Sequence, residues 1–146
     1  MAQAKKRFTP FHSTYEAFNR RVMVWICRSC DTWCENKKPT YCTTCGGTEF
    51  FYFASKAEAK RYAELLLMEK GGVIQNLEPQ LSFPLVVNDL KICEYRADFV
   101  YDEQGRTIIE DVKAKGGGDK AVTKLFEVKR KLVKALYDID ITIVRR

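Results

Sequence analysis

The sequence has no long apolar segment and almost no histidine. No uninterrupted apolar run approaches the roughly 20 residues that a membrane-spanning helix needs. The first residues, Met1 to Arg7, are polar and basic with no apolar stretch behind them, so we expect no signal peptide and a cytoplasmic protein. His12 is the only histidine, and a single histidine is more often an ordinary surface or packing residue than a catalyst. Internal repeats are also absent.

The composition predicts a water-soluble protein with a moderately basic charge balance. Apolar residues make up 46% of the chain and charged residues 30%, which is enough apolar material for a core. A length of 146 residues fits one domain with at most a small added module. The net charge of +6 suits a polyanionic partner such as nucleic acid. Lysines that only solvate helix surfaces are the simpler alternative.

Cysteines are concentrated in one short stretch. Five of the six fall between Cys27 and Cys45, and cytoplasmic proteins rarely use structural disulfides. Two C-x-x-C pairs can supply the tetrahedral four-thiolate shell that zinc prefers, with no open position for water. We therefore predict a structural zinc site. Its expected ligands are Cys27, Cys30, Cys42 and Cys45. In this interpretation Cys34 is a spare thiol and Cys93 a small core residue, while a redox role for the pairs is the weaker alternative.

The pattern divides the chain into three parts. A basic N-terminal segment spans residues 1–21. A zinc ribbon spans 22–53, with strands predicted over 22–26 and 49–53 on either side of the cysteines. An α/β core spans 54–146, where Ser55 and Glu58 form a capping box that begins a helix. Gly71 and Gly72 end that helix.

The predicted order of the core is α-β-β-β-α-β, with a mixed central sheet flanked by helices. Strands are expected over 81–87, 91–101 and 107–113, the last two joined by a four-residue turn over 102–105. A second helix is expected from Asp119, as its cap, to Leu136. Its predicted core-facing residues are Val122, Leu125, Val128, Leu132 and Leu136. A final strand is expected over 139–144.

Two acidic residues and a lysine stand out within the apolar strands. Asp98, Asp111 and Lys113 form the pattern D-x12-D-x-K across the predicted hairpin. Strand alternation places Asp111 and Lys113 on one face, and the simplest register puts Asp98 opposite Ile109, on the same face and one diagonal step from Asp111. Two nearby carboxylates suit Mg²⁺. The alternative to a metal site is that these are ordinary solvent-facing aspartates, with Lys113 as their cross-strand partner.

The order of elements and these motifs together resemble the PD-(D/E)XK nuclease superfamily. The strings Tyr95-Arg96-Ala97-Asp98-Phe99-Val100-Tyr101 and Ile109-Glu110-Asp111-Val112-Lys113 look like those of a phage-encoded, Holliday-junction-resolvase-like endonuclease family within it. The residue before Asp98 is alanine instead of the eponymous proline. The resemblance implies a restriction-endonuclease-like core, with the cytoplasm of a host cell as its location.

The resemblance also implies roles for residues. Asp98, Asp111 and Lys113 would be catalytic, and Glu58 would be the first-helix acid that joins the two aspartates in holding Mg²⁺ or Mn²⁺. The capping role of Glu58 competes with this metal role. The basic residues that we expect to contact DNA are Lys115, Lys124, Lys129, Arg28, Lys37 and Lys38.

The sequence therefore predicts a Mg²⁺-dependent endodeoxyribonuclease that acts on DNA, with branched or recombining phage DNA as the candidate substrate. A non-catalytic nucleic-acid- or protein-binding module on a nuclease-like fold is the alternative. A homodimer is an open option, because cutting both strands often uses two sites, but no interface is legible in the sequence.

Overall fold

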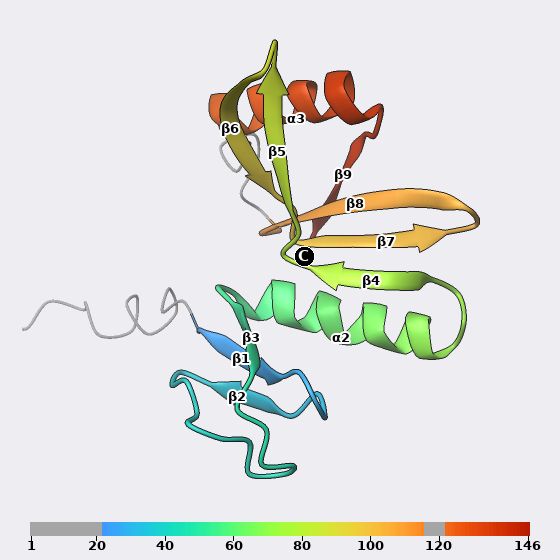
Figure 1. The fold of residues 1–146 in the computed structure, drawn as a ribbon. Coiled ribbons are helices and arrows are strands. Elements are labelled where there is room, and N and C mark those ends of the chain that lie inside the picture. Colours follow the sequence, from blue (N-terminus) through green and yellow to red (C-terminus); the bar gives the residue numbers. More distant parts are fainter. Residues whose placement is uncertain (1–21, 116–121) are drawn as a thin grey trace, which may run out of the picture. The chain divides into compact units, whose positions relative to one another are not determined.

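The computed structural model describes residues 22–115 and 122–146. The chain divides into two compact units, Met1–Ser55 and Lys56–Arg146 (Figure 1), which are described separately. The predicted N-terminal segment and the predicted helix cap at Asp119 lie outside the described residues.

The first unit is built on a small antiparallel sheet in the order β2-β1-β3. Its strands are β1 (Val24–Cys27), β2 (Trp33–Glu35) and β3 (Phe50–Phe53). Both predicted strands are confirmed as β1 and β3, while the three-residue β2 is too short to show alternation in the sequence. Trp25 in β1 lies opposite Cys34 on one side and Tyr52 on the other.

The second unit is a mixed α/β structure. In chain order its elements are α2 (Lys56–Lys70), β4 (Gln75–Pro79), β5 (Ser82–Val87), β6 (Leu90–Arg96), β7 (Phe99–Glu103), β8 (Arg106–Lys113), α3 (Lys124–Tyr137) and β9 (Ile141–Arg145). Four strands form one sheet in the order β4-β7-β8-β9, and β5 pairs with β6. The sheet is mixed, because β8 and β9 run parallel while its other pairs are antiparallel.

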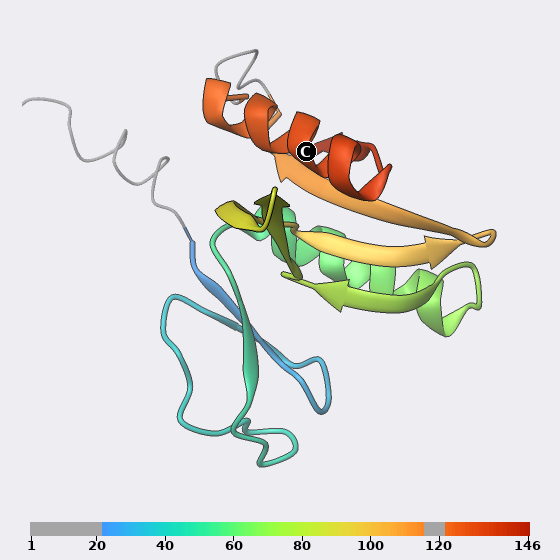
Figure 2. The ribbon, with the colours of Figure 1, turned by 45° about the horizontal axis from the view of Figure 1, so that its top comes forward.

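The two helices described in this unit cover opposite faces of its sheet (Figure 2). Helix α2 packs on β4 and β8, and α3 packs on β9 and on the β5–β6 hairpin. The main apolar core lies between the sheet and α3, where Val100 and Ile109 meet Phe126 and Val133. Residues of β8 therefore face α2 and α3 alternately.

The β7–β8 hairpin has a different register from the predicted one. Phe99 pairs with Glu110, and pairing continues to Glu103 and Arg106, so the turn has two residues instead of four. Gln104 and Gly105 both have positive φ, 50° and 76°, as a type I′ turn requires. The register therefore moves by two residues: Ile109 pairs with Val100 instead of Asp98. Beyond the last pair, the backbone N–H of Asp98 donates to the Glu110 carbonyl at 3.1 Å. The Asp98 and Asp111 side chains still lie close enough to interact.

The predicted strand over 91–101 is two strands. Strand β6 pairs with β5, and β7 pairs with β4 and β8. Between them, Ala97 donates its backbone N–H to Leu81 and Asp98 donates its own to Glu110. The chain thus changes sheets immediately before Asp98.

Strand β4 was not predicted, because Gln75–Pro79 is largely polar and ends in proline. Such a composition is tolerated at a sheet edge.

Helix α3 begins four residues later than predicted, with Thr123 instead of Asp119 as its cap, and buries only part of the predicted face. The Thr123 side chain caps it by accepting a hydrogen bond from the backbone N–H of Phe126 at 3.1 Å. Phe126 and Val133 are buried. Of the predicted core face, Val122 and Leu132 pack against the core, whereas three residues are exposed: Leu125, Val128 and Leu136. The sequence carries two overlapping apolar stripes in this helix, and periodicity alone does not choose between them.

A buried charged network joins α2 to the sheet on the face away from α3. Glu110 is 2% exposed and accepts hydrogen bonds from Arg61 Nε at 2.9 Å and Nη2 at 2.6 Å. It also accepts one from Tyr101 Oη at 2.6 Å. Hydrogen bonding to Glu110 raises the pKa of Arg61 above its usual value. Both charges are thus compensated inside the protein, and α2 is fixed against β8 at this point.

We expect Glu110→Gln to lower the free energy of unfolding by about 3 kcal/mol, because it leaves the Arg61 charge buried without its anionic partner. Urea denaturation followed by circular dichroism measures this loss. Glu64→Gln is the matched control, since Glu64 also pairs with Arg61 at 3.1 Å but its side chain is 42% exposed; its loss should stay below about 1 kcal/mol. Equal losses in the two variants would contradict the assigned importance of burial.

Candidate functional site

The first unit brings four of its cysteines together. The Sγ atoms of the four lie within 4.8 Å of one another, and the Cys27–Cys45 and Cys30–Cys42 pairs are each 3.5 Å apart. This four-cysteine cluster (Cys27, Cys30, Cys42 and Cys45) can hold a metal ion, and its all-sulfur donor set suits zinc. Cys34, in β2, is outside it.

The two cysteine turns have the same backbone construction. The backbone N–H of Asp31 bonds the carbonyl of Cys27 at 3.0 Å, and the N–H of Gly46 bonds that of Cys42 at 2.8 Å. Asp31 and Gly46 both have positive φ, 61° and 76°. Next to the second turn, a Cβ on Gly47 would lie 3.3 Å from Cys45 Sγ and 3.4 Å from Cys27 Sγ. Glycine at this position therefore lets the chain approach the sulfur atoms closely.

The thiols of this cluster also compete for protons. A backbone hydrogen bond from Cys45 lowers the pKa of Cys42 to about 6. A backbone hydrogen bond from Gly47 lowers the pKa of Cys45, but the neighbouring thiols of Cys30 and Cys27 outweigh it and raise that pKa to about 12. Four thiolates this close repel one another unless a cation neutralises them, so the donor set fits a bound zinc ion.

In the second unit, Asp98 and Asp111 lie side by side. Both lie just beyond the last pair of the β7–β8 hairpin, with their side chains close enough to interact, and the backbone N–H of Val112 donates to Asp98 Oδ2 at 2.6 Å. Lys113 Nζ donates to Asp111 Oδ1 at 2.8 Å and lies 4.7 Å from the centre of the Phe126 ring. Asp111 is only 6% exposed. The structure thus brings together the three residues singled out by the sequence.

Burial and neighbouring negative charge both raise the pKa of Asp98. Desolvation raises its pKa to about 7, opposed by the hydrogen bond from Val112 and reinforced by the charges of Asp111 and Glu58. Glu58, in the first turn of α2, is therefore close enough for its charge to affect the pKa of Asp98. Among the described residues, only the four-cysteine cluster is a group of three or more His, Cys, Asp or Glu side chains that could hold a metal ion. The structure therefore does not gather Glu58, Asp98 and Asp111 into such a group.

These residues open into a pocket of about 360 Å³ between the end of β8 and the start of α3. Its walls include Asp98, Asp111, Lys113 and the predicted DNA contact Lys129, together with Tyr95, which sequence reasoning missed. We call it the carboxylate pocket. Tyr95 stands three residues before Asp98 in the quoted motif, so proximity in sequence was the signal that could have found it.

Two other predicted DNA contacts lie elsewhere on the second unit. Lys124 is exposed at the first position of α3. Lys115 lines a separate pocket of about 470 Å³. The cationic residues of this basic pocket are Lys56, Lys60, Lys115, Arg145 and Arg146.

The predicted basic contacts of the first unit lie beside aromatic rings. The Arg28 guanidinium carbon lies 4.3 Å from the centre of the Phe51 ring, and Lys38 Nζ lies 5.6 Å from that of Trp25. Lys37 is exposed. These are cation–π geometries, which stabilise the unit and leave the charges near its surface.

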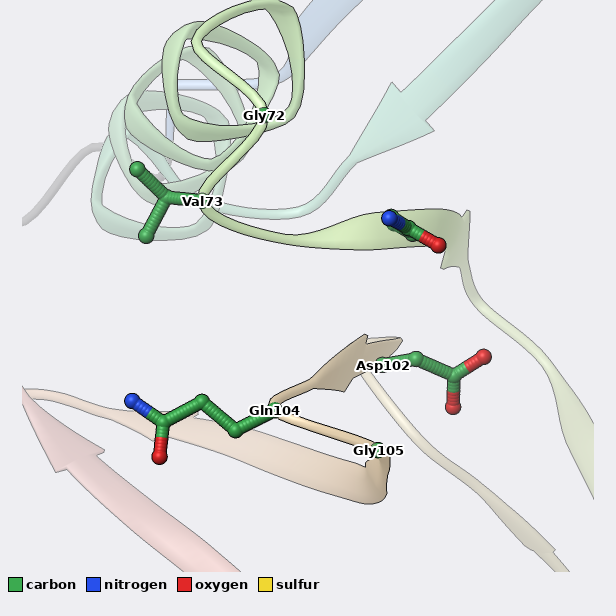
Figure 3. A pocket seen from close by; sticks show the side chains of 6 residues that line it. Gly72, Val73, Asp102, Gln104 and Gly105 are labelled. Carbon is green, nitrogen blue, oxygen red and sulfur yellow. The ribbon is translucent and has the colours of Figure 1, made fainter.

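A larger pocket, of about 490 Å³, lies near the turn of the β7–β8 hairpin and the end of α2 (Figure 3). Its polar side chains do not converge, because Asp102 and Gln104 extend in opposite directions (Figure 3). Asp102 is also engaged by Asn76 and Thr107, each at 2.9 Å. This pocket therefore lacks a comparable arrangement of catalytic groups.

The described residues thus define a mixed α/β protein that carries a four-cysteine cluster in one unit and a carboxylate–lysine pocket in the other. The chain belongs to the family described as "Protein of unknown function (DUF1064)", which matches residues 47–146. The match covers both aspartates and Lys113 and none of the four clustered cysteines. No curated protein and no solved structure matches the chain. In the part of the chain that the structure describes, no helix has the length and apolar character needed to cross a membrane.

Proposed function

We propose that the protein is a Mg²⁺-dependent endodeoxyribonuclease whose chemistry takes place in the carboxylate pocket. The observation that carries this proposal is the meeting of the Asp98 and Asp111 carboxylates in one pocket, with Lys113 bound to Asp111 at 2.8 Å. The mixed sheet between α2 and α3 would then be a restriction-endonuclease-like core, as the motif resemblance implies. Branched or recombining DNA is the proposed substrate.

The residues present fit a divalent cation. Asp98 and Asp111 supply hard oxygen ligands of the kind Mg²⁺ prefers, and Mn²⁺ accepts similar ligands. Burial is the main cause of the raised pKa of Asp98, and the repelling charge of Asp111 raises it further. A bound Mg²⁺ would relieve this repulsion, polarise the phosphate and lower the pKa of water. Glu58 is a candidate third acid, because its charge already acts on Asp98.

The remaining groups hold the pair and meet developing charge. The Val112 N–H fixes Asp98, and Asp111 orients the Lys113 ammonium group. Lys113 is 22% exposed, so it can donate to water or to a phosphate oxygen on which negative charge grows during cleavage. In this proposal Lys113 positions the attacking water or stabilises the transition state.

DNA would be held mainly through its phosphates. Lys129 lines the carboxylate pocket, while Lys115 belongs to the basic pocket near the ends of β8 and β9. We propose that both contact the DNA backbone. The zinc ion of the first unit would be structural, since four thiolates leave no open position for water.

A cleavage assay tests the proposed activity. Purified protein is incubated with plasmid, single-stranded and four-way-junction DNA in the presence of Mg²⁺, Mn²⁺ or EDTA, and the products are separated on gels. We expect metal-dependent cleavage of at least one substrate and none with EDTA. The absence of metal-dependent cleavage across this panel would refute the nuclease proposal. Binding without cleavage would instead favour a non-catalytic DNA-binding module.

A further inference from the structure

The carboxylate pocket contains a buried hydroxyl group that has no partner. Tyr95 is 3% exposed, and its Oη makes no hydrogen bond within the described part of the chain. Buried polar groups are almost always hydrogen-bonded. Tyr95 lines the carboxylate pocket, although its hydroxyl oxygen itself has less than 1 Å² of accessible surface. The unpaired hydroxyl therefore points to a ligand of this pocket that supplies the missing acceptor.

The Tyr95 ring is held firmly in place. It lies opposite Phe83 in the β5–β6 pair, with ring centres 6.3 Å apart, and on another side it contacts Phe126 at 6.4 Å. A side chain packed in this way has little freedom to turn its hydroxyl towards another protein group. The donor is thus fixed in advance, as transition-state stabilisation favours.

The surroundings of Tyr95 keep the hydroxyl protonated. Burial, with the added negative charges of Asp111 and Asp98, raises the pKa of Tyr95 above its usual value. At neutral pH the group is therefore a hydrogen-bond donor close to two carboxylates. An anion brought to those carboxylates by a divalent cation would present oxygen acceptors on this side of the pocket.

We propose that the Tyr95 hydroxyl donates a hydrogen bond to a non-bridging phosphate oxygen of the DNA strand bound in the carboxylate pocket. This rests on the proposed nuclease function and adds a substrate-contacting group to it. Tyr95 would thus work beside Lys113: the lysine supplies charge, and the tyrosine supplies a fixed neutral donor.

Tyr95→Phe tests the contact because it removes only the hydroxyl. The melting temperature should stay unchanged or rise, since a buried unpaired group is lost. The cleavage rate should fall about 10- to 100-fold. Affinity for a fluorescein-labelled duplex, measured by anisotropy with Ca²⁺ in place of Mg²⁺, should fall about 3- to 10-fold.

Tyr101→Phe is the matched control. Its hydroxyl is satisfied by Glu110 at 2.6 Å on the opposite face of the sheet, so the substitution should lower the melting temperature by about 5 °C. Its cleavage rate and DNA affinity should remain within about twofold of wild type, a change smaller than a typical hydrogen bond is worth. The two tyrosine variants are thus expected to show opposite signatures, which a purely structural role for Tyr95 would not produce.

The outcomes separate this inference from the proposed function. If wild type cleaves DNA and Tyr95→Phe cleaves and binds equally well, the contact is refuted while the nuclease proposal stands. A melting temperature that falls as in Tyr101→Phe, with full activity, also refutes it. If wild type cleaves nothing, the nuclease proposal fails and the binding measurement alone decides: weaker binding by Tyr95→Phe supports the phosphate contact, and equal binding overturns it.

Discussion

Asp111→Asn should reduce metal-dependent DNA cleavage by at least about a thousandfold, equivalent to about 4 kcal/mol of transition-state stabilisation. Asparagine keeps the shape of the side chain but removes the charge that holds both the cation and the Lys113 ammonium group. Initial rates on the preferred substrate, measured with saturating Mg²⁺, give the ratio directly. The protein should remain folded, because Asp111 contributes no side chain to the apolar core.

The same variant should lose its thermal response to Mg²⁺. A ligand that binds only the folded state at 100 times its dissociation constant stabilises a protein by about 2.7 kcal/mol. Wild type should therefore melt several degrees higher in excess Mg²⁺ than in EDTA, and Asp111→Asn should melt alike in both. This reports on cation binding independently of cleavage.

Asp89→Asn provides the control for this substitution. Asp89 lies in the exposed β5–β6 turn with φ at 63°, a conformation that asparagine also adopts readily. Its cleavage rate and Mg²⁺ response should match those of wild type. If Asp111→Asn keeps more than about a tenth of the activity, the loss is below about 1.4 kcal/mol, and the catalytic centre lies elsewhere.

The parts of the fold that the sequence predicted depend on local chemistry. The cysteine spacing predicted which four thiols meet, because each pair is brought together by its own tight turn. Strand alternation placed Asp111 and Lys113 on one face. The register of the β7–β8 hairpin depends instead on turn type. Nothing in the string Asp102-Glu103-Gln104-Gly105 made the two-residue turn evident, since glutamine is an unusual first residue for it.

The parts that were missed depend on tertiary partners. The division between β6 and β7 occurs where one run of strand-forming residues changes partners, from β5 to β8. Glu110 is buried because Arg61, 49 residues away, bonds to it. Tyr95 reads as an ordinary apolar strand residue until the pocket beside it is known. Long-range contacts of this kind override local preference.

Removing zinc should unfold the first unit and leave the second intact. In zinc-finger peptides a structural zinc contributes about 10–16 kcal/mol, more than the few buried side chains of a small sheet supply. Cys42→Ser removes one of the four ligands, so elemental analysis should show the zinc content falling from about one atom per chain towards zero.

Spectroscopy can follow the two units separately. Both tryptophans of the chain, Trp25 and Trp33, lie in the first unit, whereas α2 and α3 lie in the second. In Cys42→Ser, or after chelation of wild type, tryptophan emission should shift to the red while helical circular dichroism at 222 nm is retained. The apolar core formed by the sheet and α3 contains no residue of the first unit, which is why the helical signal should persist.

Cys34→Ser is the matched control, because it makes the same chemical change in the same unit outside the four-cysteine cluster. It should keep about one zinc atom per chain and the emission of wild type, since all four thiolates remain. Equal zinc loss in Cys34→Ser and Cys42→Ser would show that the ion does not select the four clustered thiols. If Cys42→Ser retained its zinc and its emission, three thiolates would be enough to bind the ion and keep the unit folded. That result would contradict a structural site that needs all four cysteines.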